Sequence, residues 1–284
     1  MRQILTCTDG SLYAPGTYAL TAWAARRLDA EVHVLHMLDA HRERATSADR
    51  SGNFGVDAGQ ALLLEMVDLE EKQNRLAREH GKLVLAEAER QLAAAGVSRV
   101  TVEQRHGELV ETVTSLEEKA DLLILGKRGQ GAGVAADHLG SNLERVIRAS
   151  IRPVFVASRE FPEINNFLLA YDGGHSMTKA LEFLASQPLL HGLRCHLLRA
   201  GKIDPHAEHL AQEAAAKLQA SGYEVTVELT AGEPEKVIAD SIARHHISVV
   251  LMGAYGHSRI RQLVVGSTTT AILRTCHVPV LMFR

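Results

Sequence analysis

One glycine spacing occurs twice in this chain, and it constrains the possible folds more than any other feature of the sequence. Residues 253–256 read Gly-Ala-Tyr-Gly, and nine residues later residues 266–269 read Gly-Ser-Thr-Thr. Residues 126–129 read Gly-Lys-Arg-Gly, and ten residues later residues 140–142 read Gly-Ser-Asn. Each copy follows an apolar run typical of a buried strand and precedes a pattern typical of a helix. The chain is therefore predicted to contain one structural unit twice.

Glycines between a strand and a helix have two physical uses. They reach positive φ in a tight turn, and they let bare backbone N–H groups approach an anion at the N-terminus of the helix. For one copy alone, a turn glycine and a helix-capping serine explain the residues equally well. The second copy favours the binding interpretation, with phosphate as the anion.

The rest of the sequence repeats in the same order. Residues 4–8 and 167–171 are strand-like runs, each followed by an Asp-Gly pair. Strands that alternate with helices over short links indicate parallel sheets with right-handed crossovers. We therefore predict an α/β fold of two tandem, open, parallel five-stranded sheets, flanked by helices and Rossmann-like, with strand order 3-2-1-4-5 in each.

The predicted domains are residues 1–158 and 164–284, and the first carries an insertion at about 39–80. Asp9 lies 98 positions before Gly107, whereas Asp172 lies 60 positions before Gly232, so the first half has 38 extra residues. Within them, residues 39–60 are polar and predict a long loop. Residues 60–95 predict a long helix that extends past the domain core, with a break in its pattern near Gly81.

Apolar runs follow Pro153 and Pro279, and we interpret them as edge strands whose unpaired backbone groups must be covered. Because the linker at 158–165 is also short, we predict that the halves pack about a pseudo-two-fold axis as an intramolecular pseudo-dimer. Whether two copies of the chain also form a homodimer is left open.

Composition excludes several classes of function. The formal net charge of −3 over 284 residues gives no electrostatic basis for binding nucleic acid or an anionic membrane. No apolar run reaches the roughly 18 residues of a membrane span, and Met1 leads directly into a strand-like run, so a cytoplasmic protein is expected. Three cysteines far apart in the sequence are interpreted as buried free thiols.

In an open parallel sheet, ligands bind beyond the carboxyl ends of the strands at the point where the strand order reverses. With the order 3-2-1-4-5, that point lies between strands 1 and 4. It would bring Asp9 to Gly126 in the first half and Asp172 to Gly253 in the second. A carboxylate can accept hydrogen bonds from a sugar or a base, and the glycine segment can donate to phosphate, so the predicted ligand is a nucleotide. An Asp-Gly pair alone would more simply be a turn.

The residues at 4–11 and the glycine spacing at 253–267 resemble the universal stress protein family, over essentially the whole chain and as two tandem domains. The resemblance implies an ATP-binding member, with nucleoside contacts at the two aspartates and at the ends of the second strands, and phosphate contacts at the glycine segments. By position, the implied contacts are Asp172, Ala200, Gly253, Gly256, Gly266, Ser267 and Thr268 in the second half, and Asp9, Met37, Gly126, Gly129, Gly140, Ser141 and Asn142 in the first.

The resemblance also implies ATP, or AMP or ADP, with or without Mg²⁺, and an unidentified protein partner. The first half departs from the family spacing by one residue, and Gly131 and Gly133 lie in the same segment, so the second site is expected to bind more tightly. Fixing the longer first segment would cost on the order of 1 kcal/mol or more per residue.

No catalytic residue is predicted. The chain lacks a Gly-x-x-x-x-Gly-Lys-Ser/Thr segment, so fast ATP hydrolysis is not expected. Lys127 and Arg128 are interpreted as solvated cations in preference to phosphate ligands. His206 with His209, and His245 with His246, are interpreted as surface residues, and no metal is expected. A regulatory or stress-response nucleotide-binding protein is favoured, and a slow ATPase or nucleotidyl transferase of a related fold is the alternative.

Overall fold

The computed structural model describes residues 1–39, 56–129, 141–254 and 266–284. The body of the loop predicted at 39–60 lies outside these residues. So do Gly140 and Gly256, which are predicted phosphate contacts, and Gly131 and Gly133 of the first glycine segment.

Strands and helices alternate through both halves. The first half contains β1 (Arg2–Cys7), α1 (Ala14–Leu28), β2 (Ala30–Asp39), α3 (Val56–Ala94), β3 (Val100–Gly107), α4 (Leu109–Leu116), β4 (Leu122–Gly126), α5 (Ser141–Ala149) and β5 (Val154–Ala157). The second half contains β6 (Asn166–Ala170), α6 (His175–Ser186), the 3-10 helix η1 (Pro188–Leu190), β7 (Arg194–Ala200), α7 (Pro205–Ala220), β8 (Val225–Thr230), α8 (Pro234–Arg244), β9 (Val250–Gly253), α9 (Ser267–Thr275) and β10 (Val280–Phe283).

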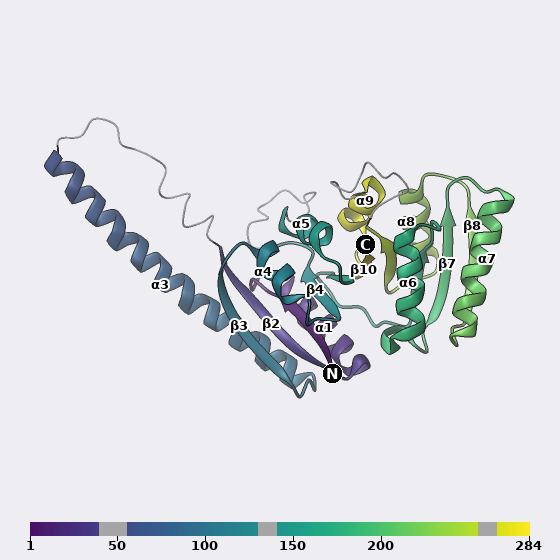
Figure 1. Ribbon diagram of the computed structural model, residues 1–284, viewed down its shortest axis with the longest axis horizontal. Coiled ribbons are helices and arrows are strands. Elements are labelled where there is room, and N and C mark those ends of the chain that lie inside the picture. Colours follow the sequence, from purple (N-terminus) through teal and green to yellow (C-terminus); the bar gives the residue numbers. More distant parts are fainter. Residues whose placement is uncertain (40–55, 130–140, 255–265) are drawn as a thin grey trace.

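All ten strands of the described residues form one sheet, in the order β3-β2-β1-β4-β5-β10-β9-β6-β7-β8. Each half has the predicted order 3-2-1-4-5 with parallel neighbours, which confirms the predicted fold class. The two predicted sheets are nevertheless one, because β5 and β10 pair antiparallel, with Phe155 opposite Leu281. Edge strands carry unpaired backbone N–H and C=O groups, so these two edges satisfy each other and set the halves side by side (Figure 1).

Both faces of the sheet are covered by helices, because its strands are apolar on both sides. In β4, Leu122 and Ile124 belong to one core cluster, while Leu123 and Leu125 belong to the other. The first cluster includes buried residues of α1, α3, α6 and α7, and the second includes those of α4, α5, α8 and α9. The two halves therefore share both cores across the junction.

Each half has an equivalent aromatic pair next to the junction between the halves. Trp23 of α1 meets Phe155 of β5 edge to face at 6.4 Å, and Phe183 of α6 meets Phe283 of β10 edge to face at 5.4 Å. Such pairs contribute about 0.5–1.5 kcal/mol beyond the area that they bury. This equivalence agrees with the predicted pseudo-two-fold arrangement.

Cationic side chains also link the halves. The Lys127 ammonium donates to the backbone carbonyl of Cys276 at 2.6 Å, and Arg284 Nη1 donates to the carbonyl of Ala149 at 3.0 Å. Ala149 ends α5, and Cys276 is the C-cap of α9. Each half therefore places a cation at the C-terminal end of a helix in the other half, where the helix dipole favours positive charge.

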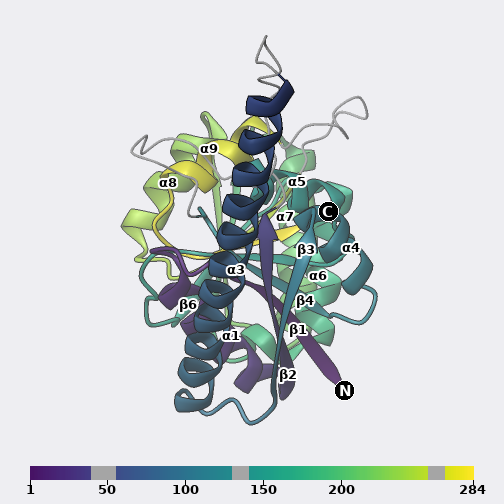
Figure 2. The ribbon, with the colours of Figure 1, turned by 90° about the vertical axis from the view of Figure 1, so that its left-hand side faces the viewer.

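The helix α3 is longer and begins earlier than predicted. It contains 39 residues and starts at Val56, so residues 56–60 are helical. It also continues through Gly81, where a β-carbon would lie 1.9 Å from Gln104 Nε2. Gly81 thus marks the close approach of α3 to β3 and no break. The equivalent helix α7 has 16 residues, and the additional turns of α3 extend beyond the strands (Figure 1, Figure 2).

The three cysteines are free, with Cys195 and Cys276 buried and Cys7 half-buried. Burial raises the pKa of the Cys7 thiol to about 12. Among the described residues, no helix is both long and apolar enough to cross a membrane.

Candidate functional site

In the first half, the structure brings the end of β1 to the glycine segment that follows β4. A β-carbon added at Gly129 would lie 2.6 Å from Asp9 Oδ2, so glycine lets the segment approach this carboxylate closely. The other carboxylate oxygen, Asp9 Oδ1, accepts a hydrogen bond from the Ser11 backbone at 3.0 Å, and the Ser11 hydroxyl donates to the Arg128 carbonyl at 3.3 Å. The aspartate and the glycine segment are thus held together.

In the second half, Asp172 stands after β6 in the place that Asp9 holds after β1. Its Oδ1 accepts a hydrogen bond from the Gly174 backbone at 2.8 Å, and Gly173 between them has φ +77°. β6 and β7 pair parallel as far as Ala170 and Leu198, so Asp172 follows the end of one strand and Ala200 ends its neighbour. The carboxylate therefore lies at the carboxyl edge of the sheet.

The start of α9 is anchored to the end of β9. Thr269 Oγ1 donates to the Gly253 carbonyl at 3.0 Å, and the Gly266 backbone donates to the Ala254 carbonyl at 3.2 Å. Among the described residues no side chain caps this helix, and Ser267 in its first turn is exposed. The first N–H groups of α9 and its positive dipole end are therefore available to an anion.

The remaining predicted residues are placed at the same edge. Gly126 ends β4, and Met37 lies near the end of β2, half-buried against the core. Thr268 is half-buried in the first turn of α9, and Asn142 is exposed in the first turn of α5, which begins at Ser141. The N-terminal turns of α5 and α9 lie on the same side of the molecule (Figure 1). Gly140 and Gly256 fall outside the described residues.

Arg199 is a candidate that the sequence analysis missed. It precedes Ala200 in β7, and its Nη1 lies 3.8 Å from the position of a β-carbon on Gly173. Its Nε is buried and has no hydrogen-bond partner among the described residues. A buried donor without an acceptor is uncommon, and it suits an anionic ligand. One arginine near a strand end gives no sequence signal that separates it from surface residues.

The first half differs at the place equivalent to Arg199. There His36 of β2 is buried, and its Nδ1 lies 2.9 Å from the Thr8 carbonyl. The imidazole of His36 already contacts a backbone carbonyl, so it has fewer hydrogen-bond donors for an anion than Arg199, whose Nε has no partner among the described residues. The two sites therefore differ at this position, although the first half places a buried guanidinium nitrogen of its own, Arg128 Nε, in its glycine segment.

The structure overturns the interpretation of Lys127 as a solvated cation. Its side chain is buried and donates to the Cys276 carbonyl, as described above. Burial lowers the pKa of its ammonium from 10.5 to about 8. Lys127 therefore links the halves.

Stability should rise with pH as the Lys127 amine loses its proton. Between about 8 and 10.5 the folded chain holds this lysine neutral while the unfolded chain still protonates it, so the unfolded state binds more protons. In urea unfolding at pH 7.5 and 10, the free energy of unfolding of the native chain should increase relative to that of Lys127→Met. An equal change in both proteins would contradict the assignment.

The histidines predicted to lie at the surface do so in large part. His206, His209 and His246 are exposed, whereas His245 is half-buried, with its Nε2 3.1 Å from Glu228 Oε2. Within the described ranges, no group of three or more His, Cys, Asp or Glu side chains is placed to hold a metal ion.

Comparison with known proteins places these features in a family. The model of the universal stress protein family matches residues 1–158 and 163–284. Universal stress protein Slr1230 of Synechocystis sp. is 40% identical over 287 residues, covering 100% of both chains. Among solved structures, a universal stress protein from Archaeoglobus fulgidus aligns with a TM-score of 0.69 at 20% identity, over 99% of this chain and 96% of that one. A putative universal stress protein from Pseudomonas aeruginosa aligns with a TM-score of 0.62 at 16% identity, over 100% and 93%.

Proposed function

Because this chain belongs to the universal stress protein family, we propose that it binds an adenine nucleotide (ATP, ADP or AMP) and acts as a regulatory or stress-response protein in the cytoplasm. Residues 1–158 and 164–284 would each form one nucleotide-binding domain. The observation that carries the proposal is the contact between the Asp9 carboxylate and Gly129, which joins the end of the first strand to the glycine segment after the fourth.

Each part of the second site has chemistry that suits one part of a nucleotide. The Asp172 carboxylate would accept hydrogen bonds from ribose hydroxyls or the adenine amino group. The N–H groups at the start of α9 would donate to phosphate, with Ser267 and Thr268 adding hydroxyls. The buried Arg199 Nε, which has no acceptor in the part of the chain that the structure describes, fits an anionic ligand here. The nucleotide would bind with or without Mg²⁺.

We further propose that the second site binds more tightly than the first. The second half has the shorter glycine segment and has Arg199 where the first half has His36. A charge-assisted hydrogen bond contributes about 1.5–3 kcal/mol, which is enough to separate the two affinities by tenfold or more.

A single-turnover experiment separates the binding protein from the slow enzyme. Protein stripped of its ligand and then loaded with radiolabelled ATP should retain intact ATP for hours after dilution. Release of ADP, or of pyrophosphate, that follows a first-order course at fixed protein concentration would instead support the ATPase or the nucleotidyl transferase. Mass spectrometry of the nucleotide that co-purifies identifies its phosphate count.

A further inference from the structure

Three leucines recur every seven residues along α3 and face solvent. Leu69, Leu76 and Leu83 have exposed fractions of 55, 66 and 70%. Seven residues make nearly two turns of an α-helix, so the three side chains form a row, here called the leucine stripe. Single exposed leucines are ordinary on protein surfaces, but a heptad row of leucines is the pattern that a second helix covers.

The described residues of the first half leave the leucine stripe uncovered. The side of α3 that packs on the sheet carries other residues, and Gly81, Val84, Ala88 and Leu92 on that side are buried. At 100° per residue, this side lies about a third of a turn from the leucine stripe. The N-terminal turns of α3 also extend past the strands of their own half (Figure 2).

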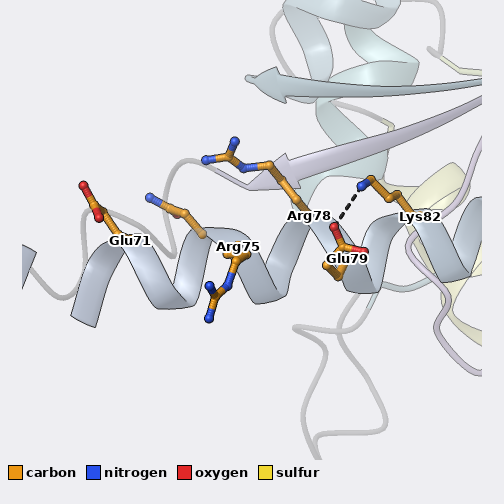
Figure 3. Close-up of a pocket in the computed structure, with 6 residues that line it drawn as sticks. Glu71, Arg75, Arg78, Glu79 and Lys82 are labelled. Atoms are coloured by element: carbon orange, nitrogen blue, oxygen red, sulfur yellow. Dashed lines mark hydrogen bonds and ion pairs between the residues drawn. The ribbon is translucent and has the colours of Figure 1, made fainter. Parts of the chain in front are cut away.

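The charges of α3 divide along its length. Residues 65–71 carry four carboxylates and no cation, and residues 72–82 carry four cations and one carboxylate. Two exposed ion pairs form inside the helix, Lys72 with Asp68 at 2.5 Å and Lys82 with Glu79 at 2.8 Å. The charges left over are negative in the first segment and positive in the second. A surface pocket on this helix is lined by the charged and polar residues Glu71, Asn74, Arg75, Arg78, Glu79 and Lys82 (Figure 3).

We propose that α3 pairs antiparallel with α3 of a second copy of this chain, so that Leu69 and Leu76 of the two leucine stripes cover each other. This orientation sets residues 65–71 of one copy against residues 72–82 of the other, and it brings Leu69 of one next to Leu76 of the other. A parallel pair would set the carboxylate-rich segments against each other, which is unfavourable. The remainder of each copy lies at opposite ends of the paired helices.

Sedimentation equilibrium of the full chain tests the pairing. The native protein should form a dimer, and the double variant Leu69→Gln, Leu76→Gln should raise the dimer dissociation constant by about 100-fold or more, because each leucine side chain loses its apolar cover. Glutamine keeps a high helix propensity, so circular dichroism should be unchanged. Glu89→Gln, exposed on the same helix outside the leucine stripe, is the matched control and should dimerise like the native chain.

Cross-linking tests the orientation. In the antiparallel pair, residue 69 lies next to residue 76 of the other copy, whereas the two residues 69 are too far apart for a disulfide. A mixture of Leu69→Cys and Leu76→Cys chains should therefore form disulfide-linked dimers under oxidation that neither variant forms alone. The native chain controls for its own three cysteines.

Several results would overturn the proposal. A native protein that stays monomeric at every concentration tested, or a double variant that dimerises like the native chain, would remove the leucine stripe as a dimer contact. Disulfide-linked dimers of Leu69→Cys alone would show a parallel pair. Binding of a monomeric native chain to anionic lipid vesicles, lost in the double variant, would assign the stripe to a lipid surface instead.

Discussion

Replacing Gly266 by valine should weaken ATP binding at the second site by about 30-fold or more. Gly266 is the N-cap of α9 with φ −57°, a conformation open to any residue, so valine adds bulk without backbone strain. Its side chain would stand where a phosphate must approach the first N–H groups of the helix. Loss of one or two charge-assisted hydrogen bonds at about 1.5–3 kcal/mol each accounts for the expected factor. Isothermal titration calorimetry with ATP measures it.

Two further variants make this result specific. Gly140→Val, at the matching place in the first half, should reduce the overall affinity less, because the first site is expected to be the weaker one. Ala220→Val adds an exposed valine at the end of α7 and should bind ATP like the native chain. Equal losses of ATP affinity for Gly266→Val and Gly140→Val would show equivalent sites. Undiminished ATP binding in the double variant would show that neither glycine segment contacts the nucleotide.

Replacing Gly16 by alanine should destabilise the chain by about 3 kcal/mol, even though alanine is normally favoured in a helix. Gly16 is buried in the first turn of α1. A β-carbon there would lie 2.2 Å from the Ser158 carbonyl oxygen and 2.8 Å from that of Arg159. Both oxygens belong to the backbone that leaves β5 toward the second half, so the segment itself must move. Urea unfolding monitored by circular dichroism measures the loss.

Gly96→Ala is the matched control, because it measures the cost of backbone strain without a steric clash. Gly96 has φ +86°, and a β-carbon there meets nothing within 4 Å. This variant should cost only about 1–2 kcal/mol, the usual penalty for a left-handed residue. If Gly16→Ala were as stable as Gly96→Ala, the close packing of α1 on the segment after β5 would be wrong.

The repeated spacings were sufficient to predict the α/β class, the strand order in each half and the extension of α3. These features follow from local patterns, since apolar runs, Asp-Gly pairs and glycine segments recur in the same order twice. The pairing of β5 with β10 into one sheet depends on contact between distant edges. The sequence indicated only that those edges need a cover.

The side chains at the site were harder to predict, for a physical reason. Lys127 is cationic and lies in a glycine segment, which predicts a side chain exposed to solvent. In the structure its side chain is buried and donates to a backbone carbonyl of the other half. Gly81 interrupts a helical pattern, yet it lies within the helix where Gln104 approaches it closely. Arg199 likewise lies near Gly173, which stands in the turn between β6 and α6. In each case the deciding neighbour is remote in the sequence.

The central claim is that an adenine nucleotide binds at the carboxyl edge of the second half, and photolabelling tests it most directly. Stripped protein is irradiated with 2-azido-ATP, with and without excess ATP, and the labelled peptides are identified by mass spectrometry. We predict ATP-protected label in the peptides that contain Asp172 or Ala200, at the ends of β6 and β7. Protected label confined to peptides from the opposite edge of the sheet, or label that excess ATP does not reduce, would contradict the account.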